Sequence, residues 1–261
     1  MKAVLMFDID GTILDGNRQI LDSTVRSIRK ARDKGAYAVI NTGRSRGIIP
    51  QNVIDIGFDG MICGCGSYVE WQGEVIQNHT ISPDLLRKAD GLFSNPGIFT
   101  AYEGPRQLYY KMGGRSPYLV KFLEKWLKDD VFSKALPFTE EAEEINKFTV
   151  FFEHPDRMDP VAADLAEDMY AIRHGDHYLE FILNGFSKAS HFGDFLRDIP
   201  DCGKIYAFGD SMNDKAMIEE ADIGVAMGNA NEDLKVVADH VTGDIHAGGL
   251  TEALMHFGLI D

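Results

Sequence analysis

Positive charge is scarce in this chain of 261 residues. Lys and Arg together number 26 against 41 Asp and Glu, which gives a formal net charge of −15. Nucleic acids and anionic membranes are bound through clusters of positive charge that contact their phosphate groups. The composition therefore disfavours a nucleic-acid or membrane partner, and an anionic small ligand would need cations or helix N-termini supplied locally.

Cysteine and long apolar runs are scarce as well. The 3 cysteines, Cys63, Cys65 and Cys202, form no disulfide framework, which is typical of a reducing compartment. Cys63 and Cys65 lack a second Cys/His pair at zinc-ligand spacing, so they do not indicate a zinc site. Neither a signal peptide nor an apolar run long enough to span a membrane is evident, so we expect a cytoplasmic protein.

What the chain does have, at both ends, is an alternation of apolar strands and helices. Strands are expected at 3–7, 36–41 and 60–63 in the N-terminal part, and at 204–209 and 223–227 in the C-terminal part. Helices are expected between them, and in the C-terminal part these lie at 188–197, 213–220, 231–238 and 250–257. This alternation predicts right-handed βαβ units, and hence an α/β fold with one doubly wound, Rossmann-like parallel sheet.

The middle of the chain has a different pattern. Residues 82–183 contain expected strands at 108–112, 147–153, 170–173 and 177–183 and helices at 118–127 and 160–169. We interpret 82–183 as an α+β module inserted into a core formed by 1–81 and 184–261. An inserted module leaves and rejoins its parent by two loops, an arrangement suited to a lid.

Polar and small residues follow several of the core strands at the points where they end. They are Asp8, Asp10 and Gly11 after the first strand, Thr42, Gly43 and Arg44 after the second, and Asp210, Asn213 and Asp214 after the strand at 204–209. Lys188 opens the helix that re-enters the core. Ligands bind beyond the carboxyl ends of the strands in an open parallel sheet, so these residues are expected at one edge.

These residue types suit a divalent metal and a phosphate. Asp8 and Asp210 offer the hard oxygen ligands that Mg²⁺ prefers, and Lys188 can hold phosphoryl oxygens. A carboxylate beside such a clamp can attack phosphorus, and a second carboxyl two residues away can transfer protons. Each motif alone has an ordinary structural explanation, such as an acidic turn, a helix cap or a surface lysine.

Four motifs and the tail carry a resemblance that covers nearly the whole chain. They are FDIDGT at 7–12, NTGR at 41–44, GFSKA at 185–189, GDSMND at 209–214 and AMGNANEDLKVVADHVT at 226–242. With them the sequence resembles a haloacid dehalogenase-like hydrolase of the Cof type, subclass IIB, whose larger cap is similar to the inserted module. Two departures are Cys65-Gly66-Ser67, where relatives often carry Asn-Gly-Ala, and Ala189, where Gly is common.

The resemblance implies roles for the motif residues. Asp8 would be the nucleophile and a Mg²⁺ ligand, and Asp10 the general acid/base, with its main-chain carbonyl also meeting the metal. Asp210 would complete the protein's metal ligands. The phosphate and substrate would be held by Thr42, Gly43, Arg44, Lys188 and Asn213, and Asp214 would orient Lys188 or a metal-bound water.

The leading interpretation is a Mg²⁺-dependent phosphatase that hydrolyses a small phosphorylated metabolite, a sugar phosphate or phosphorylated cofactor, through an aspartyl-phosphate. A sugar phosphomutase of the same fold and a non-catalytic metabolite-binding protein are alternatives. The sequence does not identify the substrate or the oligomeric state. Candidates to face the substrate from the inserted module are Tyr102, Tyr109, Tyr110, Arg115, His177 and Glu180.

Overall fold

The computed structural model describes the chain except residues 1, 129–131, 140, 191, 193–195, 197, 198 and 200. The described chain forms two compact units. The first comprises Met1–Gly43, Pro50–Gln77 and Ser187–Asp261, and the second comprises Arg44–Ile49 and Asn78–Phe186. Among the described residues, each helix is too short or too polar to span a bilayer.

The first unit is built on a mainly parallel sheet. Its described strands form an 8-stranded sheet in the order β14-β13-β12-β1-β2-β3-β4-β5. Their bounds are β1 Lys2–Phe7, β2 Tyr37–Asn41, β3 Gly60–Cys63, β4 Tyr68–Trp71, β5 Glu74–Asn78, β12 Cys202–Gly209, β13 Ile223–Ala226 and β14 His240–Val241. The strand β1 is central, and it pairs in parallel with β12 on one side and β2 on the other. This confirms the predicted doubly wound sheet.

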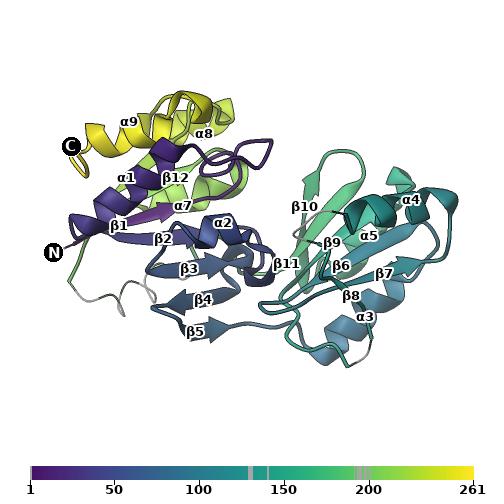
Figure 1. The fold of residues 1–261 in the computed structure, drawn as a ribbon. Coiled ribbons are helices and arrows are strands. Elements are labelled where there is room, and N and C mark those ends of the chain that lie inside the picture. Colours follow the sequence, from purple (N-terminus) through teal and green to yellow (C-terminus); the bar gives the residue numbers. More distant parts are fainter. Residues whose placement is uncertain are drawn as a thin grey trace. The chain divides into compact units, whose positions relative to one another are not determined.

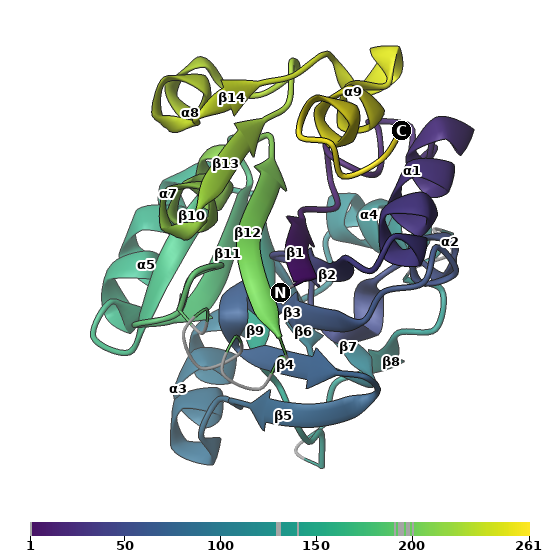
Figure 2. The same ribbon diagram turned by 90° about the vertical axis from the view of Figure 1, so that its left-hand side faces the viewer.

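Helices cover both faces of this sheet (Figures 1 and 2). The bounds are α1 Asp22–Asp33, α2 Gln51–Ile54, α7 Lys215–Glu220, α8 Glu232–Val237 and α9 Gly249–His256. Helices α1 and α9 lie side by side on one face, and α7 lies on the opposite face. The side chains of Ser27 and Thr251 hydrogen-bond between α1 and α9 at 2.9 Å. Because β1 is buried between the two layers, its last residues are apolar on both sides, as their sequence predicts.

The second unit is an antiparallel sheet with helices. Its described strands are ordered β10-β11-β9-β6-β7-β8, the last pair parallel. The bounds are β6 Ile98–Glu103, β7 Leu108–Gly113, β8 Leu136–Pro137, β9 Lys147–Phe152, β10 Met169–His174 and β11 Tyr178–Leu183, with helices α3 Pro83–Phe93, α4 Pro117–Trp126 and α5 Met158–Leu165. Side chains of α3 and α5 pack in one apolar cluster with this sheet, and those of α4 in another.

The structure contains strands that the sequence pattern did not predict. The central strand β6 follows a turn at Asn95–Gly97, and its burial on both faces gives no alternation of polar and apolar residues. The β4–β5 hairpin turns at Gln72 and Gly73, both with positive φ. Half of the residues of the helix predicted at 188–197 lie outside the described residues, and Lys188 itself is in a turn at 188–190.

Candidate active site at the carboxyl end of the first sheet

The first acidic loop follows β1 directly. Asp8 is 4% exposed, and its main-chain N–H donates to the carbonyl of Phe208 on β12 at 2.9 Å. Asp10 is exposed, in a turn in which the carbonyl of Ile9 accepts the N–H groups of Ile13 and Leu14 at 2.9 and 2.8 Å. The structure thus gives the two carboxylates different environments, one buried and one open to solvent.

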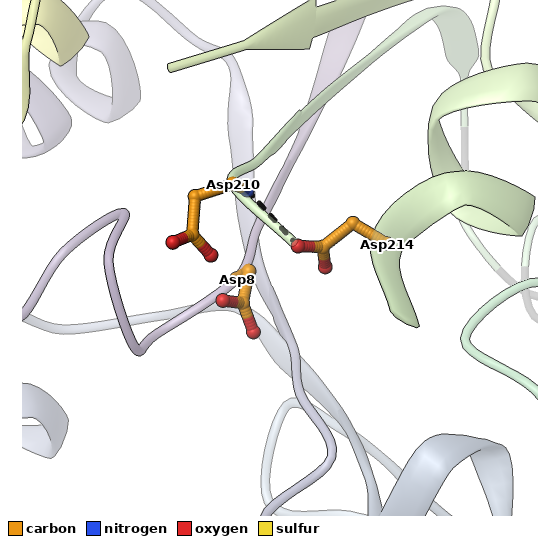
Figure 3. Close-up of side chains that lie close together, drawn as sticks. All are labelled: Asp8, Asp210 and Asp214. Carbon is orange, nitrogen blue, oxygen red and sulfur yellow. Dashed lines mark hydrogen bonds between the residues drawn. The ribbon is translucent and has the colours of Figure 1, made fainter. Parts of the chain in front are cut away.

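The second acidic loop follows β12 and is closed by a capping box. Oδ2 of Asp214 accepts the main-chain N–H of Asp210 at 3.0 Å (Figure 3). The same oxygen accepts the main-chain N–H of Ser211, also at 3.0 Å. The short helix η4, Met212–Asp214, begins at this cap. Gly209 is required before it, because a Cβ there would lie 2.5 Å from Cγ of Asp214. These contacts turn the chain sharply enough to bring two carboxylates of one loop to the strand end.

One buried lysine joins the two loops. Nζ of Lys188, in a side chain 1% exposed, donates to Oδ1 of Asp8 and to Oδ1 of Asp214, both at 2.6 Å. The carbonyl of Lys188 accepts Nδ2 of Asn41, at the end of β2, at 2.7 Å. Both the ammonium and the main chain of this residue are therefore held by groups at strand ends.

Three carboxylates meet at this point. One oxygen from each of Asp8, Asp210 and Asp214 lies within 4.8 Å of the others, and the three side chains lie close together in Figure 3. The donors are all oxygens, which hard divalent cations such as Mg²⁺ and Ca²⁺ prefer over softer metals. Three carboxylates share the one ammonium of Lys188, so a cation would balance the remaining charge. The residues present thus fit a divalent metal.

The crowding of acids is reflected in their pKa values. Burial and the neighbouring charge of Asp214 raise the pKa of Asp8 to about 8, despite the opposing effect of Lys188. Burial and Asp214 also raise the pKa of Asp210 to about 7. Burial alone would lower the pKa of Lys188, but the carboxylates of Asp214 and Asp8 outweigh it and raise that pKa. Without a further cation, the site therefore disfavours the ionised forms of Asp8 and Asp210.

The residues predicted to bind phosphate or substrate, apart from Lys188, are divided between the two units. Thr42, 1% exposed, and Gly43 follow β2 in the first unit, next to β1. Asn213 lies in η4, where its Oδ1 accepts the hydroxyl of Ser211 at 2.7 Å. Arg44 belongs to the second unit, where its Nη1 donates to the carbonyl of Ile48 at 3.3 Å. Hydrogen bonds and the carboxylate cluster therefore bring Asp8, Lys188, Asp210 and Asp214 together directly.

One candidate of the inserted module is wrong as a substrate-facing residue. Tyr102 is fully buried in the core of the second unit, where its ring packs edge-on against Phe93 and its hydroxyl donates to Asp90 at 2.7 Å. Glu180 is also buried, paired with Lys147 and with His174 at 2.7 Å. The carboxylate of Glu180 is therefore engaged by Lys147 and His174 within the sheet.

Two asparagines near the site were not predicted as functional. Asn41 holds the carbonyl of Lys188, and Asn229, in the loop after β13, donates to the carbonyl of Gly11 at 2.8 Å. An amide at the end of a fully buried strand is a signal that could have identified Asn41. Asn229 lies in the segment 226–242 that carries part of the resemblance, but its contact with Gly11 was not predictable, because the two residues are 218 positions apart in sequence.

Comparisons with known proteins agree with this geometry. The family model for haloacid dehalogenase-like hydrolases matches residues 5–254. The phosphatase BT1666 from Bacteroides thetaiotaomicron has a TM-score of 0.79 and 29% identity, covering 100% of this chain and 96% of that one. The subclass IIB sugar phosphatase BT4131 has a TM-score of 0.81 and 27% identity, with both chains covered fully.

A relative from Bacillus subtilis (strain 168) is similar over its whole length too. The 5-amino-6-(5-phospho-D-ribitylamino)uracil phosphatase YcsE is 25% identical over 259 residues, 98% of this chain and 96% of the relative. The resemblance to subclass IIB is confirmed by the full-length match to BT4131. The chain belongs to the haloacid dehalogenase-like hydrolases and is a phosphoric monoester hydrolase of that family.

Proposed function

We propose that this chain is a Mg²⁺-dependent phosphatase that hydrolyses small phosphorylated metabolites through a phosphoryl group carried by Asp8. One observation supports this above the others: Nζ of Lys188 lies 2.6 Å from both Asp8 and Asp214, in a cluster that Asp210 completes. A buried cluster with more carboxylates than ammonium groups is costly for folding alone. Its position at the ligand-binding edge of a parallel sheet favours a catalytic purpose.

The covalent step assigns Asp8 as the nucleophile. A carboxylate oxygen of Asp8 forms a bond to phosphorus as the bond from phosphorus to the leaving-group oxygen breaks. Asp10, exposed two residues away, donates its proton to that oxygen. It then takes a proton from the water that attacks phosphorus, so that phosphate leaves and Asp8 is regenerated. Lys188 stabilises the negative charge that develops on the phosphoryl oxygens.

The carboxylates of Asp8 and Asp210, with the main-chain carbonyl of Asp10, would hold Mg²⁺. The ion would supply positive charge that offsets repulsion between the carboxylate of Asp8 and the phosphate dianion. Asp214 has a different role, because Lys188 occupies one of its oxygens and two main-chain N–H groups the other. We assign Asp214 to orienting Lys188, and Thr42 and Asn213 to binding phosphate.

The substrate class rests on the low positive charge and on the relatives. A chain with 26 basic and 41 acidic residues is poorly suited to polyanionic macromolecules. The similar proteins named above include a sugar phosphatase and a phosphatase of a ribitylaminouracil phosphate, both of which act on small molecules. We assign selection among such phosphates to Arg44 and to the inserted module at 82–183.

The test is turnover of phosphorylated metabolites and of an aryl phosphate by the intact chain. Wild type with Mg²⁺ should release phosphate, and Asp8→Asn should not. Asp84→Asn changes an exposed acid of the second unit and serves as the matched control. Full activity in Asp8→Asn would refute the assignment, and an intact protein without Mg²⁺-dependent turnover on any substrate would favour a binding protein.

A phosphomutase is separated from a phosphatase by the fate of the phosphoryl group. Phosphorus NMR of a hexose monophosphate, with its bisphosphate present, would show free phosphate from a phosphatase and an isomeric monophosphate from a mutase. We expect free phosphate to accumulate in step with the loss of substrate. Isomer formation without phosphate release would contradict the proposal.

A further inference from the structure

A short loop after β13 contacts both acidic loops of the site. In this loop, residues 227–231, the N–H of Met227 donates to the carbonyl of Gly209 at 2.9 Å, and the N–H of Asn231 to the carbonyl of Asp210 at 2.8 Å. The amide of Asn229 donates to the carbonyl of Gly11 at 2.8 Å. The first two are main-chain bonds that any sequence could make. The third depends on one side chain.

Asn229 connects the first acidic loop to a buried anchor. Its Nδ2 donates to Gly11, and its Oδ1 accepts the main-chain N–H of Ile245 at 2.9 Å. Ile245 is 6% exposed and opens the short helix η5, Ile245–Ala247, which the side chain of Asp244 caps through His246 at 2.8 Å. The side-chain amide of Asn229 thus links the turn after β1 to the start of η5.

The carbonyl that Asn229 holds belongs to the residue directly after Asp10. Gly11 has a φ of +81° and no side chain, so hydrogen bonds can hold it only through its main-chain groups. On the other side of the turn, the N–H of Gly11 donates to the carbonyl of Leu14 at 2.7 Å. The peptide group directly after Asp10 is therefore held through the N–H of Gly11, and the next peptide group is held from outside the turn by Asn229.

We infer that Asn229 is a positioning residue for proton transfer by Asp10. By holding the carbonyl of Gly11, it keeps the exposed carboxyl of Asp10 aimed at the leaving-group oxygen. The inference rests on the proposed function, in which Asp10 protonates that oxygen. Since Asn229 acts through the main chain after Asp10, its loss impairs proton donation while the phosphate contacts of Lys188 persist.

The dependence of the rate on the leaving group distinguishes a positioning role of Asn229 from a purely structural one. An aryl phosphate with an electron-poor ring releases a stable anion that needs little protonation, whereas an alkyl phosphate releases an alkoxide that must be protonated. In Asn229→Ala, we expect kcat/KM for an alkyl phosphate to fall about tenfold more than kcat/KM for p-nitrophenyl phosphate, because kcat/KM covers the steps up to departure of the leaving group and excludes the later attack of water, which is common to both substrates. Asn229→Asp retains an acceptor for Ile245 but loses the donor to Gly11, so it should show the same selectivity.

Two further variants complete the experiment. Asn95→Ala is the control, because Asn95 is also exposed and its side-chain amide donates to a main-chain carbonyl, that of Leu92, at 2.8 Å. Asn95 lies in the second unit, and its replacement should leave turnover of both substrates unchanged. Asp10→Asn should show the largest difference between the two substrates. Equal losses of kcat/KM on both substrates in both Asn229 variants would overturn the inference while leaving the proposed function intact. Equal losses in Asp10→Asn would instead remove the acid role of Asp10, and the inference with it.

Discussion

Gly11 lies directly against the carboxylate of Asp210, and a Cβ on Gly11 would lie 2.0 Å from its Oδ2. The two residues come from different strand ends, β1 and β12. This approach places the first acidic loop within reach of the second, and it requires the smallest residue at position 11. Gly11 of the first motif therefore allows the two acidic loops to pack together, in addition to allowing the turn.

The first prediction concerns this contact. Gly11→Ala should lower kcat with Mg²⁺ by about 100-fold, because the new methyl group displaces Asp210 and strains a φ of +81°. Phosphate release over a range of Mg²⁺ concentrations measures the effect, and a raised Mg²⁺ requirement is expected alongside it.

Two glycines supply matched controls. Gly35→Ala introduces the same backbone strain, with a φ of +99° but open space around the Cβ, and Gly16→Ala introduces neither strain nor clash. Both should keep near wild-type kcat. If Gly35→Ala lost as much activity as Gly11→Ala, strain rather than displacement of Asp210 would be the cause.

The second prediction concerns the buried lysine. Lys188→Ala leaves the carboxylates of Asp8 and Asp214 buried without their ammonium partner, so it should lower the free energy of unfolding by about 3–5 kcal/mol without Mg²⁺. Chemical denaturation at pH 8 measures this loss. Activity should be lost as well, because phosphoryl oxygens lose their cation.

Lys147 is the matched lysine of the second unit. It is also buried, between Glu103 at 3.7 Å and Glu180. Lys147→Ala should destabilise the protein comparably, yet leave the rise in melting temperature on adding Mg²⁺ intact. That rise should change in Lys188→Ala. The same Mg²⁺ response in both variants would argue against a metal site beside Lys188.

The strand ends of the first sheet were predictable from sequence for a physical reason. Buried parallel strands appear as short apolar runs, and their carboxyl ends must share one edge, so Asp8 and Asp210 could be placed together without a structure. The contact between Asn229 and Gly11 could not be predicted, since it depends on a loop conformation and a long-range pairing. The strand β6 was missed because the buried polar residues Thr100 and Glu103 leave it with neither a continuous apolar run nor an alternating pattern.

The third prediction concerns pH. The folded protein raises the pKa of Asp8 to about 8 and of Asp210 to about 7, above the ordinary value of 3.8. Their contribution to stability is therefore fully present below pH 3.8 and is lost as pH rises through those folded-state values. A divalent cation binds the ionised forms, so it competes with protons at low pH.

The expected outcome is a Mg²⁺-induced rise in melting temperature that grows steadily between pH 5 and pH 8. Asp8→Asn should flatten this dependence and raise the melting temperature of the metal-free protein at pH 8. Calorimetric scans with and without Mg²⁺ provide the measurement. A Mg²⁺ effect that is constant over this pH range would contradict the assignment of Asp8 and Asp210 as ligands.

The central claim is that Asp8 carries the phosphoryl group during turnover. Its most direct test is a single turnover quenched in acid within milliseconds, followed by mass spectrometry of the peptide that contains Asp8. We predict one phosphoryl group on Asp8, absent from Asp8→Asn and formed at a rate at least equal to kcat. Phosphate release at the wild-type rate, with no phosphorylated Asp8 at any quench time, would contradict the account.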